Sequence, residues 1–216
     1  MTRIYLTRHG QTDWNVQKRM QGQNNSPLTA LGIQQAKALG DYLSGIELST
    51  IYSSSSLRAI QTAELIKGKR ILEIIPEEDL REINLGSWEG MFYSEIENLY
   101  PGKFDDFWNH PEQYVPLDGE TYEALKKRIS GKMEEIAKRH QGETILVVAH
   151  GIVIKTLYTY FRNQSIRDII HSPHPKSTCL CMAEKENGVW NIMKWNETAH
   201  YELIDFPQGY EGYQEV

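Results

Sequence analysis

Short apolar runs alternate with mixed polar segments along the 216-residue chain, the order expected when strands are followed by helices. Two of the apolar runs share one design. Residues 4–6 are followed by Arg8-His9-Gly10, and residues 144–149 are followed by His150 and Gly151. Both runs are rich in residue types that favour buried strands. We therefore predict two strands that each carry a histidine to their carboxyl end, where the loops of an open α/β sheet form a ligand-binding crevice.

The rest of the chain divides into further elements of the same kinds. Apolar residues recur at helical spacing within 30–43, behind Thr29 as a cap, and within 119–136, where Asp118 is the expected cap. An apolar helix is expected at 152–161. Additional strands are expected at 48–52, 71–75, 177–183 and 189–195, the last two joined by a hairpin turn at Glu186-Asn187-Gly188.

Composition places the chain among ordinary globular proteins, with 40% hydrophobic and 24% charged residues. No apolar run approaches membrane-spanning length, and no basic segment precedes an apolar one at the N-terminus, so we expect a cytoplasmic protein with no membrane partner. The net charge of −6 argues against a nucleic-acid partner, which requires a basic surface. Because no linker-like change in composition occurs, we expect one domain over 1–216.

The cysteines and the two nearby histidines predict neither a disulfide nor a metal site. Cys179 and Cys181 lie two apart in an expected strand and are predicted to be reduced, buried thiols. His171 and His174 have a spacing seen in metal sites, but prolines on either side of His174 break any helix that would align them. We therefore expect no metal and no cofactor.

Charged residues at two junctions suggest phosphate chemistry. Arg8 presents a planar guanidinium that can hold two phosphate oxygens, next to His9 at the end of a strand. Arg58 follows four serines, 53–56, where a strand runs into a helix, and a helix N-terminus favours an anion. Either arginine alone would be an ordinary surface residue. The repeated arrangement of strand, histidine and glycine is what makes a site the better interpretation.

These motifs resemble the histidine phosphatase superfamily, in its phosphoglycerate mutase-like branch. Besides Arg8-His9-Gly10 with Thr12 and Asn15, and His150-Gly151, the matching stretches are Ser53 to Ala63, Leu80 to Gly90 and Trp195 to His200. The resemblance implies a three-layer α/β sandwich, with a mostly parallel open sheet and helices on both faces. It also implies a single histidine phosphatase domain, with a helical capping segment at about 84–118.

The resemblance also implies a role for each matching residue. His9 would attack phosphorus and form a phosphohistidine, and Glu82 would protonate the leaving group, for which its pKa must be raised. The expected catalytic residues are His9, Glu82 and His150, and the expected substrate-binding residues are Arg8, Asn15, Arg58, Gln21, Gly22 and Gly151. A solvated loop explains Gln21 nearly as well, and Glu120 is either a substrate contact or a first-turn acid that favours the helix dipole.

The segment from Asn84 to Asp118 bears on the substrate. It is rich in aromatic residues, and Lys103 is its one basic residue against seven Asp or Glu. Glycolytic mutases of this family carry added basic residues here and continue the acid with Arg-His-Tyr-Gly, whereas this chain continues it with Ile83-Asn84-Leu85-Gly86. A phosphatase is therefore favoured over a mutase. The aromatic residues either cover an apolar leaving group or form a packed core.

The sequence thus predicts a metal-independent phosphomonoester hydrolase acting on a small molecule. Three alternatives stay open: a phosphoglycerate mutase, which would move phosphate within its substrate; a non-catalytic phosphate-binding module; and a phosphatase that docks on a phosphoprotein through exposed aromatic residues. The oligomeric state cannot be inferred from the sequence.

Overall fold

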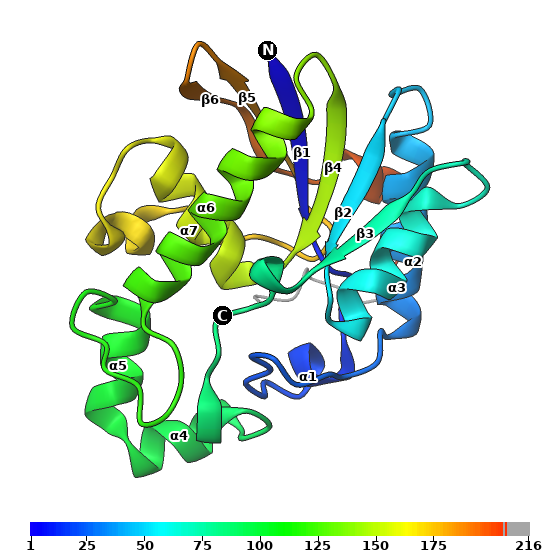
Figure 1. Ribbon diagram of the computed structural model, residues 1–216. Helices are drawn as coiled ribbons and strands as arrows, with labels where there is room; N and C mark the ends of the chain where they lie inside the picture. The colour runs from blue at the N-terminus through cyan, green and yellow to red at the C-terminus, as the bar shows by residue number, and fades with distance from the viewer. Residues whose placement is uncertain (205, 207–216) are drawn as a thin grey trace.

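A six-stranded sheet in the order β3-β2-β4-β1-β5-β6 forms the middle layer of the computed structural model, which describes residues 1–204 and 206 (Figure 1). The strands are β1 (Thr2–Arg8), β2 (Thr50–Ser54), β3 (Ile74–Glu77), β4 (Thr144–Ala149), β5 (Leu180–Glu186) and β6 (Val189–Glu197). The first four run parallel to one another, β5 pairs antiparallel with β1, and β6 pairs antiparallel with β5. The α/β class with a mostly parallel sheet is confirmed.

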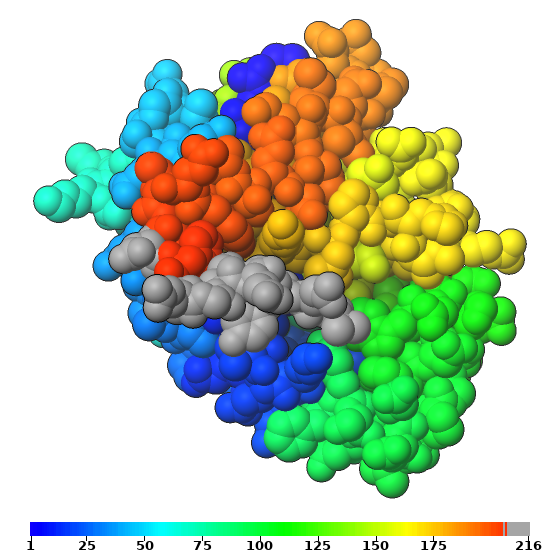
Figure 2. All heavy atoms as spheres, turned by 180° about the vertical axis from the view of Figure 1, so that it is seen from behind, coloured from blue at the N-terminus to red at the C-terminus, as the bar shows by residue number. Residues whose placement is uncertain are grey.

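Helices cover both faces of this sheet, as the resemblance implied (Figure 1). The helices are α1 (Asp13–Val16), α2 (Ala30–Tyr42), α3 (Leu57–Lys67), α4 (Tyr93–Leu99), α5 (Pro101–Asn109), α6 (Tyr122–Arg139) and α7 (Gly151–Phe161). Four short 3₁₀ helices add η1 (Glu78–Leu80), η2 (Gly86–Trp88), η3 (Ile166–His171) and η4 (Ala199–Leu203). One hydrophobic core lies between the sheet and α6 and α7, and the other between the sheet and α2 and α3. In the view from behind, the β5–β6 hairpin (orange) and η4 (red) lie next to each other on the surface (Figure 2).

Burial explains why the central strands read as unbroken apolar runs. All of β2, and all of β4 except its first residue, is buried, because helices lie on both faces, whereas β6 at the edge is nowhere fully buried. The predicted strand at 71–75 is displaced, since Ile71 is fully exposed and β3 begins at Ile74 and includes Pro76. Proline fits there because β3 is an edge strand that pairs with β2 alone.

Helix caps followed the sequence in one case and not in another. The Thr29 side chain accepts a hydrogen bond from the Gly32 amide at the start of α2, as predicted. At α6 the cap is Thr121, because the carboxylate of Asp118 instead accepts hydrogen bonds from the amide and hydroxyl of Ser87. The hairpin turn falls at Asn187 and Gly188, both with positive φ.

The segment 84–118 contributes η2, α4 and α5, which lie beyond the carboxyl ends of the parallel strands (Figure 1). Within the described part of the chain, no helix has the length and apolar character needed to cross a membrane. The glycine- and tyrosine-rich tail beyond Phe206, in which the sequence shows no signal, lies outside the described residues.

Candidate active site

A pocket at the carboxyl ends of β1 and β4 gathers most of the residues predicted from the sequence. Eight of the nine line it: Arg8, His9, Asn15, Gln21, Gly22, Arg58, Glu82 and Gly151. His150, the ninth, is fully buried directly behind, with its ring centroid 5.3 Å from that of His9. Residues from opposite ends of the chain therefore meet at one edge of the sheet, as expected for parallel strands that share an edge.

His9 is held as a neutral imidazole. It is 3% exposed, and its Nδ1 lies 2.8 Å from the carbonyl oxygen of Gly10. A carbonyl can only accept, so Nδ1 carries the proton and Nε2 keeps its lone pair. Burial, together with the nearby guanidinium groups of Arg58 and Arg8, lowers the pKa of His9 well below its usual value. The ring therefore has the form that a nucleophile requires.

Close packing of two glycines fixes the turn behind His9. A Cβ on Gly10 would lie 2.5 Å from the carbonyl oxygen of Gly32, and a Cβ on Gly32 would lie 2.1 Å from that of Gln11. The amide of Gly10 also donates to the Thr62 hydroxyl at 3.0 Å. Helices α2 and α3 thus hold the turn from two sides, and glycine is required where the backbones meet.

Arg58 connects three parts of the site. Its guanidinium is 1% exposed and donates to the carbonyl oxygens of Asn24 at 2.6 Å and Gly22 at 2.7 Å, and to His150 Nδ1 at 3.1 Å. Burial lowers the pKa of Arg58 to about 10, so the group keeps its charge at neutral pH. The arginine therefore fixes the loop that carries Gln21 and Gly22 while it presents positive charge to the pocket.

His150 is bound on both ring nitrogens. Nδ1 accepts from Arg58, so Nε2 carries the proton and donates to the Ser54 hydroxyl at 2.8 Å, with Ser56 at 3.2 Å. Ser56 directly precedes α3, but its side chain makes no cap hydrogen bond. In this arrangement His150 holds Arg58 in place, and it reaches a phosphoryl group only if its ring exchanges one of these partners.

Glu82, in the segment after η1, lines the same pocket as His9. Its carboxylate oxygens accept hydrogen bonds from the amides of Ile83 at 3.0 Å and Ile152 at 3.1 Å. Burial raises the pKa of Glu82, although the two amides and the arginines act in the opposite direction. A carboxyl group with a raised pKa next to a nucleophile is suited to proton transfer.

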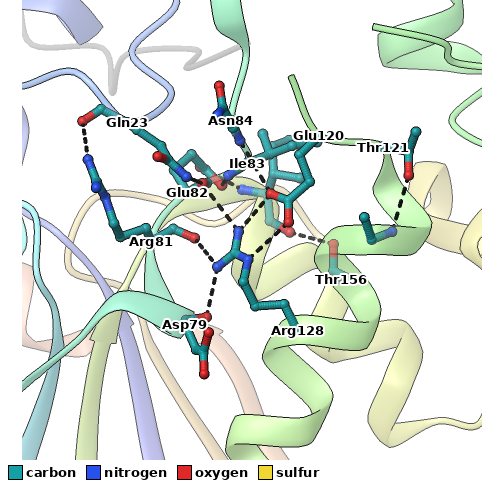
Figure 3. A network of polar contacts seen from close by, with 12 residues as sticks. Gln23, Asp79, Arg81, Glu82, Ile83, Asn84, Glu120, Thr121, Arg128 and Thr156 are labelled. Carbon is teal, nitrogen blue, oxygen red and sulfur yellow. Dashed lines mark hydrogen bonds and ion pairs between the residues drawn. The ribbon is translucent and has the colours of Figure 1, made fainter. Parts of the chain in front are cut away.

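A polar network on the outer side of Glu82 positions its backbone (Figure 3). Arg128 on α6 donates to both carboxylate oxygens of Glu120 at 2.9 and 2.7 Å, and to the carbonyl oxygens of Asp79 and Arg81 at 2.8 and 3.0 Å. Glu120 in turn accepts from the Asn84 amide at 3.3 Å. Glu120 does not line the pocket, and it precedes the Thr121 cap of α6, so neither of its two interpretations describes it. It instead braces the chain around Glu82 through Arg128 and the Asn84 amide.

Two amide side chains, Asn15 and Gln21, are the remaining predicted polar residues of the pocket. The Asn15 amide oxygen accepts from the amide and hydroxyl of Thr12, at 3.0 and 2.9 Å, which leaves its NH₂ group as a donor on the pocket side. The Gln21 amide oxygen is buried and has no hydrogen-bond partner among the described residues. Gln21 is 9% exposed, so the alternative of a solvated loop residue does not describe its side chain.

The aromatic segment packs largely as core, and part of it also lines the pocket. Trp88 is 1% exposed and packs among Tyr100, Phe104 and Tyr114, so much of the cluster is core. Three of its residues also line the pocket, namely Tyr93, Phe107 and Trp108.

Sequence reasoning missed several other pocket residues, including Arg19, Lys155 and His174. His174 had been considered only for its spacing from His171, and Lys155 lies in an apolar helix without any motif of its own. Within the described residues, no cluster of three or more His, Cys, Asp or Glu side chains could hold a metal ion.

Comparison with known proteins identifies the family. The model of the histidine phosphatase superfamily (branch 1) matches residues 4–198, and the chain belongs to this superfamily. It is 35% identical to phosphoserine phosphatase 1 of Hydrogenobacter thermophilus over 202 residues, which cover 93% of this chain and 94% of the relative. It is 32% identical to a metal-independent phosphoserine phosphatase of Arabidopsis thaliana over 216 residues, covering 98% and 89%.

A solved structure, Bacillus stearothermophilus YhfR, is also similar. It shares 41% sequence identity with a TM-score of 0.91, over 93% of this chain and 99% of that one. The predicted fold class, family and enzyme class, a hydrolase of phosphomonoesters, agree with these relatives.

Proposed function

We propose that this protein hydrolyses small phosphomonoesters through a phosphohistidine on His9, without a metal ion. The observation that carries the proposal is a neutral His9, with its Nε2 lone pair available, in a pocket that also holds the guanidinium groups of Arg8 and Arg58 and the carboxyl group of Glu82. Relatives named as phosphoserine phosphatases support a small phosphorylated substrate.

Each residue has a defined part in the proposed reaction. His9 Nε2 attacks phosphorus in line with the ester oxygen, the P–O bond breaks, and Glu82 gives its proton to the departing oxygen. Arg8, Arg58 and the Asn15 amide stabilise the charge on the equatorial oxygens, with the backbone at Gly22 and Gly151 shaping the space around them. Gln21 contributes its amide NH₂ group.

The second step releases the enzyme. Glu82, now a carboxylate, takes a proton from water as that water attacks the phosphohistidine, and the P–N bond breaks to give inorganic phosphate and neutral His9. His150 acts through Arg58, whose position it fixes. The positive side chains supply the charge stabilisation that a metal ion provides in other phosphatases.

The finer points of partners and location are also proposed. A net charge of −6 favours a small-molecule substrate over a nucleic acid. Two free, buried thiols, Cys179 and Cys181, favour a reducing compartment such as the cytoplasm.

The test measures inorganic phosphate released from p-nitrophenyl phosphate and O-phosphoserine with excess chelator. Wild type should release phosphate and form an acid-labile phosphoryl group on the protein, and His9→Ala should do neither. His110→Ala, which removes an exposed histidine outside the pocket, is the matched control. Interconversion of phosphoglycerates that depends on a bisphosphoglycerate, without release of phosphate from any ester, would establish the mutase instead.

A further inference from the structure

Three basic side chains of the pocket, Arg19, Lys155 and His174, have no part in the proposed chemistry. Arg19 is engaged by the Gln17 side chain and the Gly90 carbonyl oxygen, which leaves Lys155 and His174 to be explained. Lys155 lies on α7 four residues after Gly151, so the two positions share one face of the helix, about 5–6 Å apart. A Cβ at Gly151 would lie 3.6 Å from the Arg8 guanidinium. Side chains lean toward the N-terminus of their helix, which directs Lys155 back toward that guanidinium. A further positive charge, besides those of Arg8 and Arg58, therefore lies about one helical turn from Gly151.

Lys155 has no counterion within the described residues. No hydrogen bond or ion pair reaches its ammonium group there, and burial alone lowers its pKa, with no carboxylate acting against that effect. Among the described residues, Glu82 is the one acid that lines the pocket, and it interacts with Arg58 and Arg8. A half-buried lysine ordinarily has an anionic partner, because the partial loss of water is unfavourable for its charge.

His174 is held rigidly beside Lys155. Its carbonyl oxygen accepts from the Asn196 side chain at 2.8 Å, and the next carbonyl, that of Pro175, accepts from Arg8 at 2.8 Å. Burial and the charges of Arg8 and Lys155 hold the pKa of His174 at about 3, so the ring is neutral. Its Nε2 is buried and lacks a hydrogen-bond partner in the described part of the protein.

Trp108 adds a third unsatisfied group to the same pocket. Its indole Nε1–H is buried and makes no hydrogen bond to any described residue. Buried polar groups of native proteins are almost always hydrogen-bonded, so two such groups and an unpaired ammonium in one pocket indicate a ligand that supplies acceptors. The neighbouring Phe107 is apolar, which strengthens any charge-assisted hydrogen bond formed there.

We infer that Lys155, His174 and Trp108 form a second anion subsite that binds a carboxylate on the leaving group of the substrate. The inference rests on the proposed function and narrows its substrate class to phosphomonoesters of small hydroxy acids. One ammonium group and two uncharged ring nitrogens match the single charge of a carboxylate better than the double charge of a second phosphate. The aromatic segment contributes no basic residue to the pocket, but α7 and the loop after η3 supply them.

The test uses two substrates that differ only in the carboxylate, O-phospho-L-serine and O-phosphoethanolamine. For wild type, kcat/KM should favour phosphoserine by about tenfold or more, the value of one charged hydrogen bond. Lys155→Met should bring the ratio near one, and Trp108→Phe, which removes only the N–H, should lower it severalfold. Lys138→Met removes the same charge from an exposed site on α6 and should keep the ratio.

A binding measurement separates this inference from the proposed function. His9→Ala is titrated with both compounds by calorimetry, alone and combined with Lys155→Met. Phosphoserine should bind about tenfold more tightly than phosphoethanolamine only when Lys155 is present. Equal affinities, or a preference that survives Lys155→Met, overturn the subsite even if the wild type is an active phosphatase.

Two further outcomes are decisive. If no ester is hydrolysed but the difference in binding appears, the proposed function fails and the subsite stands. If the protein binds propane-1,3-diol bisphosphate more tightly than phosphoserine, and Lys155→Met removes this difference, the subsite binds a second phosphate and not a carboxylate. Melting temperatures of all variants establish that each one folds.

Discussion

Arg128 provides the sharpest test of how the fold controls the chemistry, because it lies outside the pocket and hydrogen-bonds the chain that leads to Glu82. Its guanidinium joins α6 to the segment that carries Glu82, through the Glu120 carboxylate and the carbonyl oxygens of Asp79 and Arg81 (Figure 3). Arg128→Met keeps much of the length and the apolar stem of the side chain and removes every one of these hydrogen bonds. The catalytic side chains themselves are unchanged.

The size of the expected loss in unfolding free energy follows from the burial of the Arg128–Glu120 ion pair. The Arg128 and Glu120 side chains are 20% and 15% exposed, so removal of one leaves a largely buried, unpaired charge. Such a change costs about 3–5 kcal/mol of unfolding free energy. A displacement of about 1 Å at the proton donor is enough to lower a rate about a hundredfold. We expect a lower melting temperature and impaired proton transfer.

The assay compares leaving groups. Proton donation matters greatly for the alkoxide of O-phosphoserine and little for p-nitrophenolate, which departs without a proton. Arg128→Met should therefore lower kcat about a hundredfold on phosphoserine and severalfold at most on p-nitrophenyl phosphate. Arg139→Met, at the exposed end of α6, is the control and should lower neither rate.

Two results would refute this reasoning. An equal loss on both substrates would mean that Arg128 supports the phosphate site in general, and unchanged rates would mean that other contacts hold Glu82. Stability gives an independent check, because the double variant Arg128→Met/Glu120→Leu removes both charges and should recover part of the lost unfolding free energy.

Three further predictions concern pH and packing. The raised pKa of Glu82 and the lowered pKa of His9 should make kcat/KM fall as pH rises through the Glu82 pKa, and Glu82→Gln should abolish this alkaline fall in a pH–rate profile. The fold lowers the pKa values of His9 and His150, so only their unfolded forms gain protons as pH falls below 6.5. Urea titrations should therefore show about 1 kcal/mol less unfolding free energy per histidine at pH 5.5 than at pH 6.5. The loss should be smaller in His9→Ala. Gly10→Ala should cost about 1–3 kcal/mol and at least tenfold in rate, because its Cβ would lie 2.5 Å from the Gly32 carbonyl oxygen. Gly131→Ala, in an open position on α6, should instead raise the melting temperature, and a Gly10→Ala variant of unaltered stability would disprove the close packing of the two glycines.

The sequence predicted the parts of the site that belong to strand ends. Parallel strands buried on both faces are nearly continuous apolar runs, and a histidine and a glycine directly after such a run are visible without any structure. The arrangement at His9 and at His150 could therefore be predicted, as could Arg58 at the start of α3. Residue order along the chain was sufficient to assign the family.

The sequence could not predict which partner a polar side chain selects. Ser54 and Ser56 have hydroxyl groups suited to a helix cap, but both lie against the imidazole of His150, which comes from a distant strand. Asp118 likewise bonds Ser87 in place of the helix. Local propensity describes what a side chain can do, and the choice among several possible partners is made by tertiary contacts.

Lys155 and His174 were missed for a related reason. Their neighbours in sequence are apolar residues and prolines, so neither carries a local signature of a binding site. They become notable only when the fold brings them to the same pocket as Arg8 and leaves them without partners among the described residues.

The central position of β1 has a consequence for how the protein folds. Arg3 pairs with Thr144 and Arg8 with Ala149, so the middle of the sheet forms only by closing a loop that contains most of the chain. Pairings this distant in sequence slow the folding of a domain. During synthesis β1 leaves the ribosome first and must wait, exposed, until β4 follows it. The proposed nucleophile His9 and the groups around it therefore come together late, and no fragment that ends before His150 can form the candidate site.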